Sequence, residues 1–176
     1  LGLIGAGSIG KEIARKAKPF GMNIVAVKRT PEQVEFIDEV YDINEMDSVF
    51  TRSDFIVLAL PLMESTRNLI GKKEIEKMKS TAYLINIARG EILDEHALVE
   101  ALKQKRIAGA VLDVFREEPL GQDSELWNVE NLIITPHISW SGEYTFERLT
   151  EHVLENMARY FNGEKLKYLV ESEIGY

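Results

Sequence analysis

The 176-residue sequence contains no cysteine and no long hydrophobic run. The lack of cysteine excludes disulfide bonds and thiolate metal sites, and it favours the reducing cytoplasm as the expected location. No apolar stretch reaches the ~18 residues that a membrane-spanning helix needs, and no charged-then-apolar leader is present. The net charge of −8 argues against a nucleic-acid-binding protein, whose surface would be basic. We therefore expect no membrane or nucleic-acid partner.

The composition that remains is 45% hydrophobic and 28% charged, which is typical of one globular domain. A domain of this size buries roughly 70% of its unfolded surface, so its core needs no cross-links. The chain begins Leu1-Gly2-Leu3-Ile4, without methionine and already inside an apolar run. We therefore expect a single domain over residues 1–176 that belongs to a longer protein.

Short apolar runs alternate with longer amphipathic stretches along the chain. The runs are nearly continuous, as in strands buried on both faces: Leu1–Ile4, Ile24–Val27, Phe55–Leu60, Ala82–Ile87, Ile107–Val111 and Leu132–Ile134. The amphipathic stretches predict helices over Ile9–Lys18, Glu45–Arg52, Lys72–Lys79, Asp94–Lys105 and about Glu143–Phe161. Because parallel strands need crossover helices, the alternation predicts an α/β fold: a Rossmann-type, doubly wound parallel sheet in three αβα layers.

Two of these helices have sequence features that predict their ends and their buried faces. Asp94 is a plausible N-cap for a helix with an apolar stripe at Ala97, Leu98, Ala101 and Leu102. Asn162-Gly163 is a stop signal for the last helix. In that helix we expect an inward face made of Leu149, Val153, Leu154 and Met157.

A glycine-rich string directly follows the first expected strand and opens the first helix. Gly5-Ala6-Gly7-Ser8-Ile9-Gly10 has the spacing G-x-G-x-x-G in the context that this motif requires. Gly5 permits a tight turn, Gly7 lets the backbone approach a pyrophosphate, and Gly10 lets the helix pack against the sheet. The helix N-terminus then offers N–H groups to the anion. The alternative is a purely structural turn.

The residues that end the second strand select between NAD and NADP. An acidic residue there binds the ribose 2′-hydroxyl of NAD, whereas a cation suits the 2′-phosphate of NADP. This chain has Lys28-Arg29-Thr30, 18 residues after Gly10, and no carboxylate among them. Thr30-Pro31-Glu32-Gln33 is also a capping box, which predicts a further helix N-terminus near that phosphate. We expect NADP to be preferred over NAD, the alternative being a pair of solvated surface cations.

Three later segments follow successive strands, where ligands of open α/β sheets bind. They are Asn86–Gly90, Leu112–Pro119 and Thr135–Ser139, and they bring an arginine, carboxylates and a histidine to one edge of the sheet. A 2-keto acid needs these groups, because arginine binds a carboxylate and polarises the keto oxygen while histidine transfers a proton. A carboxylate beside the histidine stabilises its charged form.

In these motifs the chain resembles the D-2-hydroxyacid dehydrogenase family. The motifs occur in the same order as in that family, and the resemblance runs along the whole chain. The matching stretches are Leu1–Gly10, Leu60-Pro61-Leu62 with Thr66, Asn86–Gly90 with Ile92-Leu93-Asp94, Gly109–Pro119, Thr135–Ser139 and Leu166–Val170. The resemblance implies an NAD(P)-dependent oxidoreductase that transfers a hydride between the cofactor and a D-2-hydroxy or 2-keto acid, with no metal. Lys28 departs from the acidic pattern of NAD-specific members and resembles the glyoxylate/hydroxypyruvate reductases, so glycerate/hydroxypyruvate or glycolate/glyoxylate are the expected substrate pairs.

The resemblance also implies roles for individual residues. Arg89 would bind the substrate carboxylate and carbonyl, while His137, paired with Glu118, would protonate the keto oxygen. Asp113 would contact the nicotinamide side, and Ile87 and Ala88 would line its ring. The full set expected at the cofactor is Gly5, Gly7, Ser8, Ile9, Gly10, Lys28, Arg29, Thr30, Leu60, Pro61, Thr66, Ile87, Ala88, Arg89, Asp113, His137 and Ser139.

In the family a smaller N-terminal domain completes the substrate pocket and closes over the cleft, and this chain lacks it. We therefore expect the chain alone to bind cofactor but to turn over little, since water is not excluded. The resemblance also makes a homodimer through this domain plausible.

Two other functions remain open. A formate-dehydrogenase-like enzyme would keep the arginine and histidine but change the carboxylate partner, so Glu118 disfavours it. A redox-sensing module, like the corepressors that resemble this family, keeps the same three residues. Turnover of a keto acid by the full-length protein would separate that alternative from an enzyme.

Overall fold

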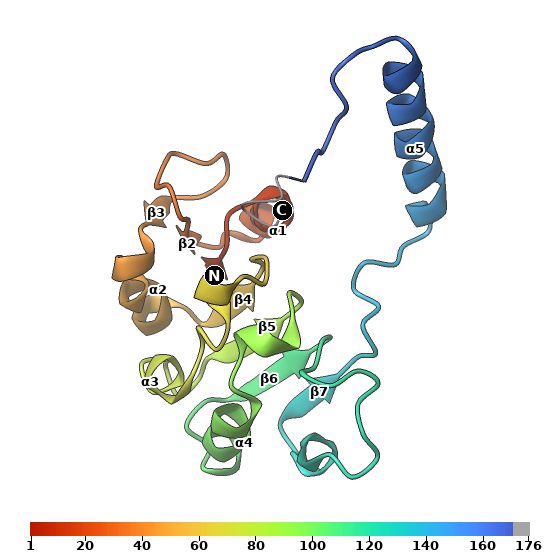
Figure 1. Ribbon diagram of the computed structural model, residues 1–176. Helices are drawn as coiled ribbons and strands as arrows, with labels where there is room; N and C mark the ends of the chain where they lie inside the picture. The colour runs from red at the N-terminus through yellow and green to blue at the C-terminus, as the bar shows by residue number, and fades with distance from the viewer. Residues whose placement is uncertain (171–176) are drawn as a thin grey trace. The chain divides into compact units, whose positions relative to one another are not determined.

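A computed structural model describes residues 1–170 (Figure 1). The chain falls into two compact units, Leu1–His137 and the residues from Ile138 onward. The single domain expected over residues 1–176 stays a prediction, and its last six residues lie outside the described part. No helix among residues 1–170 is long and apolar enough to cross a membrane.

The first unit is built on one parallel sheet of seven strands in the order β3-β2-β1-β4-β5-β6-β7. This confirms the predicted doubly wound, Rossmann-type sheet. The direction of strand order reverses between β1 and β4, which is the switch point where such sheets bind ligands. The strands are β1 Gly2–Ile4, β2 Val25–Val27, β3 Glu39–Tyr41, β4 Phe55–Leu58, β5 Tyr83–Asn86, β6 Gly109–Leu112 and β7 Leu132–Ile134.

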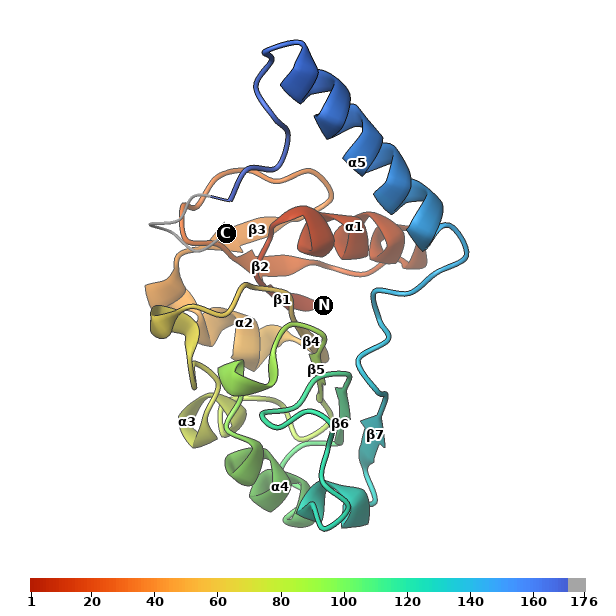
Figure 2. The same ribbon diagram turned by 45° about the vertical axis from the view of Figure 1, so that its right-hand side comes forward.

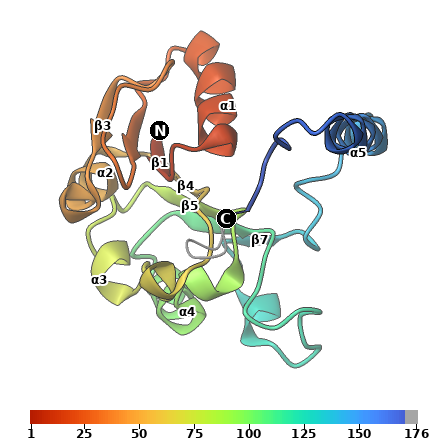
Figure 3. The ribbon, with the colours of Figure 1, turned by 45° about the horizontal axis from the view of Figure 1, so that its top comes forward.

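Helices of the first unit lie on both faces of this sheet, with α1 on one side and α2, α3 and α4 on the other (Figures 1, 2 and 3). Strand residues alternate between two hydrophobic cores: Leu3 packs in the core on the α1 side, whereas Ile4 packs with α2, α3 and α4. The α-helices are α1 Ser8–Ala17, α2 Asp47–Arg52, α3 Lys72–Ile75 and α4 Glu95–Lys103. Short 3₁₀ turns cover Lys18–Phe20, Ile43–Glu45, Glu64–Thr66, Gly90–Ile92 and Glu125–Asn128.

The strand register aligns the last residues of all seven strands. Ile4 pairs with Val27 and Leu58, and the row continues through Asn86, Leu112 and Ile134. Tyr41 extends the row on the outer side of Val27. The segments that follow the strands therefore start from one edge of the sheet, which we call the carboxyl edge.

The predicted cap of α4 is confirmed, because the Asp94 carboxylate accepts the Ala97 N–H at 3.1 Å. Its apolar stripe is buried at Leu98 and Leu102 and partly buried at Ala97 and Ala101.

Two expected helices differ from the prediction. No helix forms over Thr30–Gln33, so the predicted helix N-terminus near the second strand is wrong. A capping box stabilises a helix end only where an apolar face follows to be buried, and here the chain enters β3 instead. The helix predicted over Lys72–Lys79 is shorter and ends at Ile75.

The second unit contains α5, Thr145–Phe161, which ends at Asn162-Gly163 as predicted. Gly163 has a φ of 69°, the left-handed conformation that glycine adopts past a helix C-terminus. The expectation that Leu149, Val153, Leu154 and Met157 face inward is wrong, because these side chains are 50–59% exposed. Helical periodicity predicts which residues share a face, but it does not predict what covers that face.

Candidate active site at the carboxyl edge

The glycine loop turns sharply from β1 into α1. Gly5 has a φ of +107°, and its N–H donates to the carbonyl of Val27 at 3.1 Å. A Cβ on Gly5 would lie 2.4 Å from the carbonyl oxygen of Ala59, and one on Gly10 would lie 2.2 Å from that of Gly5. Both positions therefore require glycine for the chain to fold this way.

Gly7 differs, because no described atom lies within 4 Å of where its Cβ would be. It precedes α1, whose first turn starts at the exposed residues Ser8 and Ile9. No side chain caps this end, and no acidic residue lies in its first turn. Open space beside an uncapped helix N-terminus fits the pyrophosphate of a dinucleotide. Gly7, Ser8 and Ile9 are the residues that would hold it.

Lys28, Arg29 and Thr30 leave the carboxyl edge from β2. Lys28 is the first residue after the strand, and its side chain is 26% exposed. Arg29 and Thr30 are exposed. The Lys28 ammonium contacts the carboxylate of Glu32. Two cations thus lie at the position expected for the ribose, and Lys28 has an acidic neighbour in Glu32.

Leu60, Pro61 and Thr66 belong to the loop that follows β4. The buried Thr66 hydroxyl donates to the Pro61 carbonyl at 2.8 Å and accepts the Met63 N–H at 2.7 Å. Thr66 therefore has a clear structural role in closing this loop. That these residues border an adenosine stays a prediction.

Asn86, the last residue of β5, holds the segment that carries Arg89. Asn86 is fully buried; its side-chain oxygen accepts the Ala88 N–H at 3.0 Å, and its amide donates to the Arg89 carbonyl at 3.0 Å. The Arg89 side chain is anchored to the Ala88 carbonyl at 2.7 Å, although Arg89 is exposed as a residue. These bonds fix the backbone around Ile87 and Ala88 and hold the Arg89 guanidinium in a defined position.

Glu118 and His137 form a hydrogen-bonded pair between the segments that follow β6 and β7. Glu118 Oε2 lies 2.8 Å from His137 Nδ1, and Glu118 Oε1 accepts the Phe115 N–H at 2.9 Å. The Phe115 N–H and then the His137 hydrogen bond, with a further contribution from the Arg89 charge, hold the pKa of Glu118 below its usual range. Glu118 is therefore a carboxylate near neutral pH. His137 has a φ of 54°, uncommon for a residue with a side chain and frequent at functional sites.

Asp113 follows β6 and is buried, with 2% of its surface exposed. Its carboxylate accepts the Thr135 hydroxyl at 2.5 Å, and its N–H donates to the Asn86 carbonyl at 3.0 Å. It thus links the ends of three neighbouring strands. Ser139 lies in the second unit and is exposed. The contact of either residue with a cofactor stays a prediction.

The sequence did not single out Gly90 and Glu95, which hold the Phe115–Glu118 segment in place. A Cβ on Gly90 would lie 1.9 Å from the Phe115 carbonyl carbon, so the two backbones touch. Glu95, at the start of α4, accepts the Arg116 N–H at 2.7 Å. Burial is the main cause that raises the pKa of Glu95. These are backbone contacts between distant segments, for which the sequence contains no signal beyond the glycine itself.

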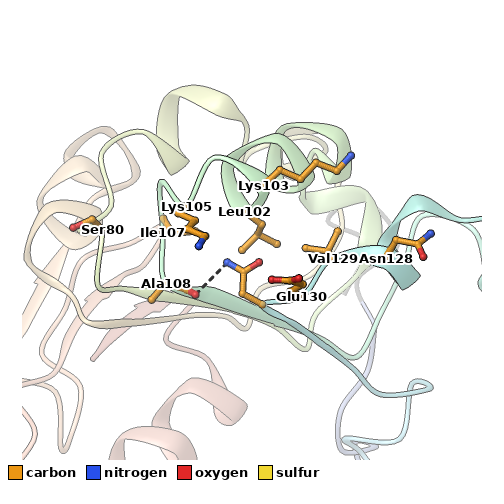
Figure 4. Close-up of a pocket in the computed structure, with 10 residues that line it drawn as sticks. Ser80, Leu102, Lys103, Lys105, Ile107, Ala108, Asn128, Val129 and Glu130 are labelled. Atoms are coloured by element: carbon orange, nitrogen blue, oxygen red, sulfur yellow. Dashed lines mark hydrogen bonds between the residues drawn. The ribbon is translucent and has the colours of Figure 1, made fainter.

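One hollow in the surface of the first unit lies away from these residues. It has a volume of about 630 Å³ and is lined by Ile107 and Ala108 before β6 and by Glu130 and Asn131 before β7, with Lys103 and Lys105 nearby (Figure 4). It therefore lies at the opposite, amino edge of the sheet and contains none of the predicted site residues. Within residues 1–170 no group of three acidic or histidine side chains could hold a metal ion.

The carboxyl edge thus combines two kinds of chemistry. The β1 and β2 ends offer helix N–H groups and cations that suit the phosphates of a nucleotide. The β5, β6 and β7 ends offer a guanidinium and a histidine–carboxylate pair that suit an organic acid and a proton transfer. Both belong to the first unit, Leu1–His137.

Comparison with known proteins places these motifs in a family. Residues 1–139 match the model of the D-isomer specific 2-hydroxyacid dehydrogenase, NAD binding domain. The glyoxylate reductase of Thermococcus gammatolerans is 44% identical over 179 residues, which cover 99% of this chain and 52% of that protein. The chain therefore spans about half the length of this curated relative.

Two solved structures share the fold at 31% identity and a TM-score of 0.92 each. One is a D-isomer specific 2-hydroxyacid dehydrogenase from Xanthobacter autotrophicus in complex with NADPH and MES, where the match covers 100% of this chain and 72% of that one. The other is an NADPH-dependent glyoxylate/hydroxypyruvate reductase from Sinorhizobium meliloti in complex with NADP and sulfate, covering 99% and 56%.

Proposed function

This chain belongs to the D-isomer specific 2-hydroxyacid dehydrogenase family, as its NAD-binding domain, and from this premise we propose that it serves an NADP-preferring reductase of small 2-keto acids. Glyoxylate and hydroxypyruvate are the proposed substrates, with glycolate and D-glycerate as the products. Support comes from the names of the relatives and from the cations at the end of β2.

The observation that carries the proposal is the 2.8 Å contact between His137 Nδ1 and Glu118. Because Glu118 engages Nδ1, Nε2 is the ring nitrogen that would give its proton to the keto oxygen. Arg89 would bind the substrate carboxylate and orient the carbonyl. When bound, the reduced nicotinamide supplies the hydride that the carbonyl carbon receives. Ile87, Ala88 and Asp113 would face the ring, and the expected role of Ser139 at the cofactor stays a prediction.

NAD(P) is the cofactor that the family implies, and the glycine loop fits it. Gly7, Ser8 and Ile9 would bind the pyrophosphate, and Leu60, Pro61 and Thr66 would border the adenosine. Lys28, Arg29 and Thr30 would meet the 2′-phosphate of NADP, which NAD lacks. We also infer a homodimer and a cytoplasmic location, both of which stay predictions.

The direct test is reduction of glyoxylate and hydroxypyruvate by the full-length protein with NADPH. His137→Asn should lower kcat by about 10²- to 10⁴-fold, the usual range for a general acid. A full-length protein that binds NADPH but reduces neither acid would instead support the redox-sensing alternative.

A further inference from the structure

The loop that follows β2 contains carboxylates as well as the two cations proposed to bind the phosphate. Residues 28–38 include two cations and three carboxylates. Each carboxylate contacts a lysine, and the lysines come from this loop, from α1 and from the turn after α1. The pairs are Lys28–Glu32, Lys11–Glu35 at 3.0 Å and Lys18–Asp38 at 2.6 Å.

Of these lysines, Lys28 lies nearest the expected ribose. Its N–H donates to the Tyr41 carbonyl at 3.0 Å, and the preceding residue, Val27, accepts the Gly5 N–H at 3.1 Å. The Lys28 backbone is thus one residue away from a direct bond to the glycine loop. A group on the adenosine ribose of a nucleotide bound at that loop would come within reach of the Lys28 ammonium.

The contact between Lys28 and Glu32 is not a by-product of helical spacing. The two residues are four apart, but residues 31–34 are not helical. The loop itself brings the carboxylate back over the ammonium. Glu32 is 62% exposed, so it can leave without disturbing the core.

We propose that Glu32 is a specificity-determining residue, whose carboxylate competes with the 2′-phosphate of NADP for the Lys28 ammonium. The inference rests on the proposed function, because it takes the nucleotide to bind at the glycine loop. A phosphate monoester carries about −1.5 to −2 charges near pH 7 and displaces a carboxylate from Lys28. NADH has only a hydroxyl there and leaves the pair intact. Glu32 therefore weakens NADPH binding selectively and makes the NADP preference less steep than two cations alone would give.

The test measures the dissociation constants of NADPH and NADH by calorimetry for the wild-type chain and for Glu32→Gln. An exposed ion pair of this kind changes binding by about one- to fivefold. We expect Glu32→Gln to tighten NADPH binding about threefold while NADH binding changes by less than about 1.5-fold. The ratio of the two constants is decisive, because both cofactors share the pyrophosphate.

Glu35→Gln is the matched control, because it removes the same charge from the same loop at a pair with Lys11. It should leave the ratio unchanged. In a Lys28→Met background, Glu32→Gln should no longer change the ratio, since the two effects are coupled only through the ion pair. Thermal unfolding followed by circular dichroism verifies that each variant is folded.

An equal gain for both cofactors in Glu32→Gln would overturn the inference, because Glu32 would then act only through overall charge. An unchanged ratio would overturn it as well. A wild-type chain that binds neither cofactor is a different result: it contradicts the proposed function, and the inference is then withdrawn with it.

Discussion

At the scale of single residues, the three glycines of the glycine loop differ in what a side chain would meet. Gly5 and Gly10 are closed in by backbone carbonyls at 2.4 and 2.2 Å, whereas Gly7 has open space around it. Gly5 and Gly10 are therefore needed to build the loop. Gly7 is needed only if a ligand must approach the backbone there. Glycine at positions 5 and 10 therefore serves folding, whereas glycine at position 7 would serve binding.

We predict that Gly5→Ala and Gly7→Ala have opposite consequences. Gly5→Ala should destabilise the domain by about 2 kcal/mol or more, because it combines a positive φ with a backbone clash. Gly7→Ala should cost less than about 1 kcal/mol but weaken cofactor binding about tenfold or more, since its methyl group would occupy the pyrophosphate space. Thermal unfolding and calorimetry measure the two effects. Wild-type affinity in folded Gly7→Ala would mean that no phosphate lies there.

The adjacent carboxylates Glu117 and Glu118 provide a second comparison at this scale. Glu118 contacts His137 at 2.8 Å, and the Phe115 N–H and His137 hold the pKa of Glu118 below its usual range. In the full-length protein, Glu118→Gln should slow keto-acid reduction by about tenfold or more, because the amide no longer stabilises a charged imidazole. Glu117→Gln is the control and should keep the wild-type kcat. Equal rates in the two variants would remove Glu118 from the mechanism.

At the scale of elements, the alternation of apolar runs and amphipathic stretches predicted most strands and helices. Six of the seven strands and the ends of α4 and α5 follow from apolar runs, Asp94 and Gly163. The missed strand β3, Glu39–Tyr41, has no apolar run because it lies at the sheet edge and is partly exposed. A short edge strand is formed by its partner β2 rather than by its own pattern. The capping box at Thr30 was misleading for a similar reason. A local signal for a helix start does not show that the chain goes on into β3 instead of a helix.

The candidate site follows the same division. Arg89, Glu118 and His137 could be predicted because motifs after strands reach one edge of a parallel sheet. The contacts that hold them could not: Asn86 binds backbone groups of its own segment, and Gly90 and Glu95 contact the backbone of the distant Phe115–Arg116 segment. Those contacts depend on register and packing, which only the folded chain defines.

The edge strand β3 is tied to α2 by charge, and this predicts a pH dependence of stability. Hydrogen bonds from Arg52 and then Tyr41 lower the pKa of Glu39 from 4.5 to about 2. Because the folded value lies below the unfolded one, Glu39 stabilises the fold above about pH 4.5 and loses that contribution as the pH falls toward 2. Urea unfolding should show wild type more stable than Glu39→Gln at pH 6, with the difference vanishing near pH 2.

A double variant controls for the helix partner. In an Arg52→Met background, the pH-dependent difference that Glu39→Gln produces in the free energy of unfolding should shrink to the part that the Tyr41 hydroxyl supports. A difference of undiminished size there would show that Arg52 is not the main group that lowers the pKa of Glu39.

At the scale of the whole molecule, the chain spans about half the length of the glyoxylate reductase that it matches. Its first unit contains the glycine loop, the cations after β2 and the histidine–carboxylate pair on one edge. If this edge is catalytic as proposed, it works well only when the substrate is held and water is kept out.

We therefore predict that the 176-residue chain binds cofactor but reduces glyoxylate at least about 100-fold more slowly than the full-length protein. NADPH consumption under saturating glyoxylate measures both rates side by side. A chain that turns over at a comparable rate would show that residues 1–176 already provide the complete pocket.

The most direct test of the proposed function is calorimetric titration of the chain with NADPH and with NADH. We expect both to bind at the glycine loop and NADPH to bind about tenfold tighter, a gap of ~1.4 kcal/mol, through the cations after β2. Equal or reversed affinities would contradict it, because Lys28 and Arg29 would then be ordinary surface cations and the proposal of an NADP-preferring reductase would fail.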